Sequence, residues 1–251
     1  MVEDAPRLLL KNALRSILTA MVLGVGFAWL MDTIVDLGGA FLARTAVLLC
    51  IGALLVLLPL PAHHPFDRLG AANLITMIRG VLVLLLLGFV GMGTTPRLQI
   101  AALCVAIISA ALDAVDGWAA RRTQMSSAYG ARFDMETDAL LIFTLSVLVW
   151  QFDKAGAWVL VSGLMRYAFL AAGLLLRWLQ RPLSPSLRRK AAAVLQAVSL
   201  VIAVAPFVSR SLSGPLCALA LVVLTWSFLI DIAWLRRRTL EMMAATRCKL
   251  T

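Results

Sequence analysis

Eight apolar runs, each about 20 residues long, follow one another along the chain and constrain its fold more than any other feature. They cover residues 14–31, 40–60, 74–92, 98–118, 131–152, 155–178, 191–208 and 215–234. Such a run spans the hydrocarbon core of a bilayer as one α-helix. Helices are favoured because a backbone in lipid must satisfy its own hydrogen bonds. With 62% hydrophobic and only 14% charged residues, the chain is predicted to be an all-α, polytopic membrane protein with about eight transmembrane helices.

Lysine and arginine are distributed unequally between the segments that flank these runs. With the N-terminus placed on the inner side, 18 of the 23 basic residues fall at inner segments and four at outer ones, while Arg166 lies within a run. Basic residues concentrate on the cytoplasmic side of membrane proteins. We therefore expect a multi-pass protein of a bacterial inner membrane with both termini in the cytoplasm. The net charge of +10 follows from this pattern and suits anionic lipids, so it does not indicate a nucleic-acid partner.

Residues 113–138 place four carboxylates at helical spacings in this otherwise apolar chain. Asp113 and Asp116 are three residues apart, and Asp134 and Asp138 are four residues apart. At about 100° per residue, each pair shares one face of its helix. An acid close to hydrocarbon is costly unless it is hydrated, paired or bound to a cation, which makes it a candidate functional residue. We expect the two pairs to face each other across the short connection between their helices.

Neighbouring residues divide between this face and the other side of the second helix. Gly130 shares the face of Asp134 and Asp138, whereas Arg132 and Glu136 point away from it. Glu136 is therefore not expected to join the carboxylate cluster.

The residue types around the acids indicate metal and phosphate chemistry. Carboxylate oxygens suit Mg²⁺ or Mn²⁺, which usually bind a few carboxylates together with substrate phosphates. Gly117 and Ala120 leave room for a nucleotide base or ribose against the helix backbone, and Arg121 offers a planar fork for a phosphate. Because the acids lie at the predicted cytoplasmic ends of their helices, a soluble nucleotide head can reach them while an acyl tail stays in the bilayer.

The acidic segment resembles the signature of the CDP-alcohol phosphotransferase family, D-x2-D-G-x2-A-R-x8-G-x3-D-x3-D. Every fixed position is met, by Asp113, Asp116, Gly117, Ala120, Arg121, Gly130, Asp134 and Asp138. The resemblance covers residues 70–236 and implies a six-helix transmembrane core. We accordingly divide the chain into an N-terminal hairpin and loop (1–69), the core domain (70–238) and a cytoplasmic tail (239–251).

The resemblance also implies an activity and a set of roles. Such enzymes displace CMP from a CDP-linked donor, usually CDP-diacylglycerol, with the hydroxyl of a small alcohol. Asp113, Asp116 and Asp134 are then expected to hold the metal ions with Asp138 at their edge, and Asp138 to act as the catalytic base. Family members are commonly homodimers with both termini in the cytoplasm.

Further nucleotide contacts are expected from the same resemblance. Asn73 and Thr76 open the first core helix in an Asn–Thr–Arg element that is similar to one common in the family. They are expected to touch the nucleotide or the metal site, together with Asp116, Gly117, Ala120, Arg121 and Gly130. The alternative is that Asn73 and Thr76 mark an ordinary helix start.

Three basic residues are candidates for binding the acceptor alcohol. Arg166 is a cation within an apolar run and must face a cavity or a partner, so it is a candidate for binding an acidic acceptor, with an ion pair to Asp231 or another acid as the alternative. Arg188 and Lys190 are candidates as well, or else serve as membrane anchors. The acceptor stays open among glycerol 3-phosphate, inositol phosphate, serine, choline and a second phospholipid.

Two functions of other classes compete with the enzyme. A cation transporter would use the acids as ion ligands, but such sites lie near the bilayer midplane, often on broken helices. An inactive membrane scaffold would keep the motif without turnover. Release of CMP distinguishes the enzyme from both alternatives.

Overall fold

The computed structural model describes residues 4–58, 70–123, 127–181, 183 and 186–248. The regular secondary structure within these ranges is helix, with no strand, which confirms the predicted fold class. The α-helices are α1 (Asp4–Val35), α2 (Gly39–Leu57), α4 (Gly70–Gly88), α5 (Pro96–Thr123), α6 (Ala128–Gln151), α7 (Leu160–Leu175), α8 (Leu187–Val204) and α9 (Arg210–Cys248), and two short 3₁₀ helices are η1 (Ala157–Val159) and η2 (Arg177–Gln180).

Many of the helices are long and apolar and expose hydrophobic side chains on the outside of the bundle, as expected for a membrane protein. Five segments of the described residues are long and apolar enough to cross a bilayer: α1, α2, α5, α9 and the continuous segment formed by η1 and α7. Helix α4 is apolar but shorter. Large apolar side chains face outward, such as Leu174 at 79% and Leu187 at 86% exposure. This surface is compatible with lipid rather than with water.

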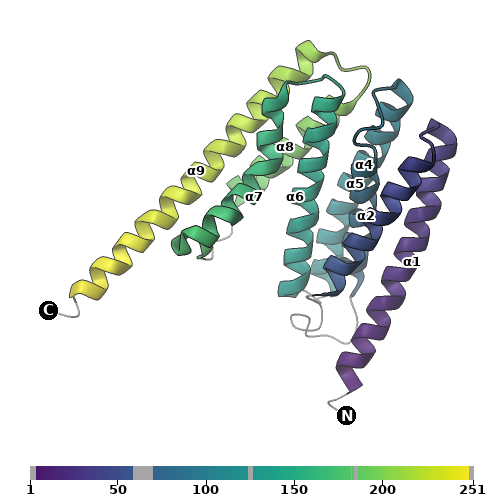
Figure 1. The fold of residues 1–251 in the computed structure, drawn as a ribbon. Helices are drawn as coiled ribbons and strands as arrows, with labels where there is room; N and C mark the ends of the chain where they lie inside the picture. The colour runs from purple at the N-terminus through teal and green to yellow at the C-terminus, as the bar shows by residue number, and fades with distance from the viewer. Residues whose placement is uncertain (1–3, 59–69, 124–126, 182, 184–185, 249–251) are drawn as a thin grey trace.

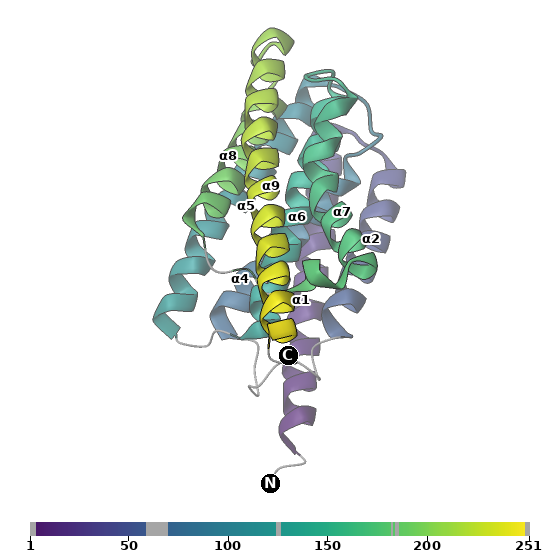
Figure 2. The same ribbon diagram turned by 90° about the vertical axis from the view of Figure 1, so that its left-hand side faces the viewer.

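The core lies between α4, α5, α6 and α8. α4 packs against α1, α2, α5 and α6, while α8 packs against α5, α6 and α9. Figure 1 shows α1 and α2 on one side of this centre and α7 and α9 on the other. In both Figure 1 and Figure 2 the start of α1 and the end of α9 lie at the same end of the bundle, and in Figure 1 α6 begins at this end too. We call this the terminal end.

Two side chains near the opposite end tie the end of α6 to the start of α9. The buried Lys154 donates hydrogen bonds to the carbonyl oxygens of Ala205, at 2.9 Å, and Val208, at 2.6 Å, and Ser213 donates to the carbonyl of Lys154. A buried ammonium needs several acceptors. These bonds fix the connection between α8 and α9 against the end of α6.

Several helix predictions were wrong in their bounds. The run 14–31 lies within α1, which begins ten residues earlier, at Asp4. The run 155–178 was predicted as one helix, yet a 3₁₀ turn precedes α7 and another follows it. The run that was predicted to start at Pro215 starts five residues earlier and extends to Cys248. Pro215 is tolerated because it lies near the start of the helix, where its missing N–H removes a single hydrogen bond, and arginine sustains the helix beyond the apolar part.

Candidate active site

Helices α5 and α6 bring three aspartates together toward the terminal end of the bundle. Asp113 comes from α5, and Asp134 and Asp138 come from the first half of α6. One carboxylate oxygen from each lies within 4.8 Å of the others. The side chains are between 41% and 45% exposed, so a soluble ligand can reach them. Glu136 is outside this group, as its position on the helix predicted.

The start of α6 is held in place by a side-chain cap. Ser127 adopts an extended conformation before the helix, and its Oγ accepts a hydrogen bond from the N–H of Gly130 at 3.0 Å. A serine in this position satisfies an N–H group that the helix itself leaves unpaired. The cap fixes where α6 begins and therefore where Asp134 and Asp138 face.

A buried arginine from α4 stands among the three aspartates. Arg79 is 1% exposed; its Nη2 lies 2.8 Å from Asp113 Oδ1 and also pairs with Asp138 Oδ1, while its Nη1 lies 2.7 Å from Asp134 Oδ1. One planar fork thus joins α4, α5 and α6. Sequence reasoning counted Arg79 only as an inner-side charge and as the end of the Asn–Thr–Arg element. The signal that could have revealed it is an arginine inside an apolar run, for which an acidic partner is required.

The charge and donors of this cluster fit a divalent cation. Three carboxylates and one guanidinium leave two negative charges in excess. Carboxylate oxygens at such separations are the ligands that Mg²⁺ and Mn²⁺ prefer. Each ion pair of Arg79 with these three acids uses the Oδ1 atom, and a carboxylate has a second oxygen that can accept a cation. The residues present therefore fit a metal ion.

Four residues of the motif lie on the last part of α5, where side chains are outside the described part of the structure. Asp116, Gly117, Ala120 and Arg121 continue the helix beyond Asp113. Their expected roles in binding metal and nucleotide remain predictions.

Asn73 and Gly130 approach each other closely where α4 meets α6. A Cβ atom on Gly130 would lie 2.4 Å from Asn73 Oδ1, so a larger residue at this position would force the buried Asn73 side chain to move. Asn73 is 6% exposed and Thr76 is 3% exposed, with the Thr76 hydroxyl donating to the Ala72 carbonyl at 3.1 Å. The expected nucleotide contacts of these residues remain predictions, but Gly130 has a packing role that the sequence did not reveal.

We predict that Gly130→Ala lowers the free energy of unfolding by about 1–3 kcal/mol, as overpacking does. In an Asn73→Ala background the same change should cost much less, because its clash partner is gone. Thermal unfolding of the four proteins measures this coupling. Gly26→Ala is the matched control, since a Cβ there meets nothing within 4 Å. Equal costs of Gly130→Ala in both backgrounds would contradict the packing role.

The candidate acceptor residues have partners away from the aspartates. Arg166 pairs with Glu136, which agrees with the alternative of an ion pair to Asp231 or another acid. Arg188 pairs with Asp231, and its Nη1 lies 2.7 Å from Ser227 Oγ.

Lys190, the third acceptor candidate, is an exposed residue of α8. Within the described part of the chain, none of the three candidates forms a hydrogen bond or ion pair with Asp113, Asp134 or Asp138. Their role in binding the acceptor stays a prediction.

Comparison with known families accounts for this arrangement. The family model described as CDP-alcohol phosphatidyltransferase matches residues 69–231. The chain belongs to this family. Searches of curated proteins and of solved structures returned no match. Family membership makes the protein an integral membrane transferase of substituted phosphate groups that acts in phospholipid synthesis. Helices α1 and α2 lie outside the matched region, whereas Arg79 and the three aspartates lie inside it.

Proposed function

We propose that this protein transfers a phosphatidyl group from CDP-diacylglycerol to the hydroxyl of a small alcohol and releases CMP. The observation that carries the proposal is the group of three aspartates from α5 and α6 around Arg79, within a chain of this family. A new bond forms between the alcohol oxygen and the phosphorus of the phosphatidyl group, and the bond from that phosphorus to the CMP oxygen breaks. The hydroxyl proton passes to a carboxylate, for which we propose Asp138.

The chain's own residues would prepare this reaction by position and charge. Asp113, Asp116 and Asp134 would hold Mg²⁺ or Mn²⁺ with Asp138 at the edge, and the bound metal would neutralise the donor pyrophosphate and polarise its phosphorus. Arg79 keeps carboxylates from different helices together that would otherwise repel each other. Asp138 accepts a proton best where it can hydrogen-bond the incoming hydroxyl. Positioning and electrostatics of this kind account for most of phosphoryl-transfer catalysis.

The remaining nucleotide and acceptor assignments complete the proposal. Asn73, Thr76, Gly117, Ala120 and Arg121 would bind or make room for the CDP moiety, with Asp116 and Gly130. Arg166, Arg188 and Lys190 are kept as acceptor candidates, which requires that Arg166 and Arg188 exchange their present acidic partners for an anionic alcohol.

Membrane orientation and assembly belong to the same proposal. The excess of basic residues on one side supports an active site and both termini in the cytoplasm of a bacterial cell. The family resemblance supports a homodimer, which light scattering in detergent would test.

We predict that the purified protein releases CMP from CDP-diacylglycerol with Mn²⁺ or Mg²⁺ and one alcohol of a panel. A chelator should abolish the release, and added metal should restore it, because the excess negative charge of the cluster otherwise opposes the donor pyrophosphate. Quantifying CMP by chromatography checks both results and identifies the acceptor. A folded protein that releases no CMP with any alcohol and metal would contradict the proposed donor.

A further inference from the structure

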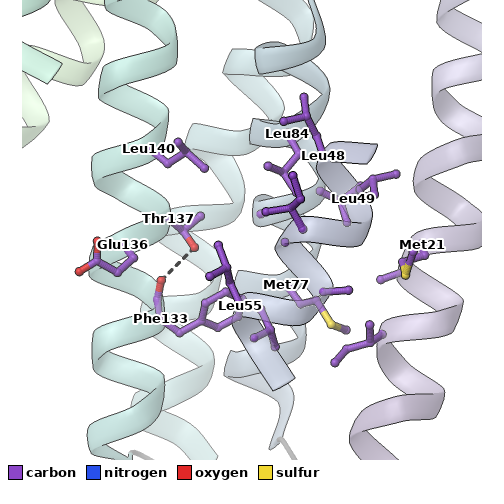
Figure 3. Close-up of a pocket in the computed structure, with 18 of the residues that line it drawn as sticks. Met21, Leu48, Leu49, Leu55, Met77, Leu84, Phe133, Glu136, Thr137 and Leu140 are labelled. Carbon is purple, nitrogen blue, oxygen red and sulfur yellow. Dashed lines mark hydrogen bonds between the residues drawn. The ribbon is translucent and has the colours of Figure 1, made fainter. Parts of the chain in front are cut away.

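A large apolar cavity lies between the N-terminal hairpin and the core. Its volume is about 650 Å³, and it is partly open to the outside of the molecule. Figure 3 shows its wall: Met21 from α1, Leu48 and Leu55 from α2, Met77 from α4 and Leu140 from α6. Without α1 and α2 this cavity would be an exposed face of α4 and α6. The volume is in the range of cavities that hold small molecules.

The surroundings of this cavity decide what can fill it. α1 and α2 are long and apolar enough to span a bilayer, so their inner walls are at membrane depth. Apolar cavities exclude water, and the medium around a membrane protein at this depth is hydrocarbon. An acyl chain is therefore the natural occupant of the cavity.

The polar residues of the wall gather at one end. Along α6 the lining residues run from Tyr129 and Arg132, near the start of the helix, to Leu140, a distance of about 16 Å at 1.5 Å per residue. Arg132 is exposed, and within the described part of the chain it has no ion-pair partner. Glu136 is already paired with Arg166. The cavity thus has a cationic end and an apolar end, which is complementary to an anionic lipid.

This cavity is on a different side of α6 from the aspartates. Arg132 and Asp134 are two residues apart, which is about 200° around the helix, and the aspartates do not line the cavity. A donor whose pyrophosphate is held at the aspartates is therefore not expected to occupy this space.

We propose that the hairpin and the core together bind one phospholipid, with an acyl chain in the cavity and its phosphate at Arg132. This site is separate from the proposed transferase site. It gives a role to α1 and α2, which lie outside the family's matched region: they form the second wall of a resident lipid site.

Native mass spectrometry of the detergent-washed full-length protein tests the proposal, with the retained lipid identified after extraction. We expect about one anionic phospholipid per chain, and at least a fivefold loss in Gly80→Phe and in Arg132→Gln. Gly80 lines the cavity, and a Cβ there meets nothing within 4 Å, so the ring would fill the space. Gly26→Phe and Arg15→Gln are the matched controls; Gly26 is an exposed helix glycine with the same open surroundings, and both controls should keep the lipid.

Three results would overturn the proposal. The wild type could retain no phospholipid, the two cavity variants could retain as much as the controls, or the lipid could be CDP-linked and disappear in Asp113→Asn, which would make it the donor. Phosphatidic acid with a diazirine at the end of one acyl chain provides a test that needs no variant. It should label peptides that contain Leu48, Leu84 or Leu140, which line the end of the cavity away from Arg132, and labelling confined to the outer face of α9 would contradict the site.

Discussion

Asp138→Asn is expected to reduce CMP release by about 10²–10⁴-fold, the usual contribution of a general base. An amide has nearly the same shape as the carboxylate but cannot take the proton of the attacking hydroxyl. Arg79 would keep its pairs with Asp113 and Asp134, so the fold should survive. Binding of CDP-diacylglycerol should change little. Initial rates of CMP release and equilibrium binding of the donor, measured on the same preparation, separate the two effects.

The matched control for this variant is Asp153→Asn. Asp153 lies at the other end of α6, is 78% exposed in its side chain and pairs with Arg210, so its substitution should leave turnover unchanged. If Asp138→Asn keeps CMP release within about tenfold of the wild type, the carboxylate is not the base. A parallel loss of donor binding would instead place Asp138 mainly in the binding of metal and donor.

The sequence predicted the approach of the three aspartates because local geometry controls it. Asp134 and Asp138 share a face of one helix by spacing alone, and few residues separate the start of that helix from the end of the one that carries Asp113. The fold class was predictable for a similar reason, because a bilayer allows long apolar runs few structures other than helices. The chemical roles of the acids follow from the family and not from their proximity.

The role of Arg79 was not predictable, because its partners are 34 to 59 residues away along the chain. Helical periodicity does not say how α4 is rotated against α5 and α6. An arginine in an apolar run requires an acidic partner, but four acids and several helix faces were available to it. Arg166 illustrates the same limit: an ion pair with Asp231 or another acid was the stated alternative, and only the structure identifies the partner as Glu136, while Asp231 pairs with Arg188.

Arg79→Leu is expected to destabilise the metal-free protein by about 3 kcal/mol. Breaking a buried ion pair costs about 3–5 kcal/mol, and we expect the lower end because the three aspartates are half exposed and water can screen part of their repulsion. A divalent cation supplies the charge that the guanidinium no longer provides. Mn²⁺ should therefore raise the Tm of Arg79→Leu more than that of the wild type, and thermal unfolding with chelator and with increasing Mn²⁺ measures both values.

The matched control for Arg79→Leu is Arg132→Leu. It removes an arginine of α6 that lies on a different side of this helix from Asp134 and Asp138. Arg132 is exposed and has no ion pair within the described residues, so the Mn²⁺ response of this variant should equal that of the wild type. Arg79→Lys should be intermediate, because an ammonium keeps the charge but cannot bridge three carboxylates with a planar fork. Equal Tm values for Arg79→Leu and the wild type in chelator would mean that the Arg79 guanidinium is not needed to stabilise the three aspartates. If added Mn²⁺ leaves the difference in Tm between Arg79→Leu and the wild type unchanged, the metal ion and the guanidinium do not compensate the same charges.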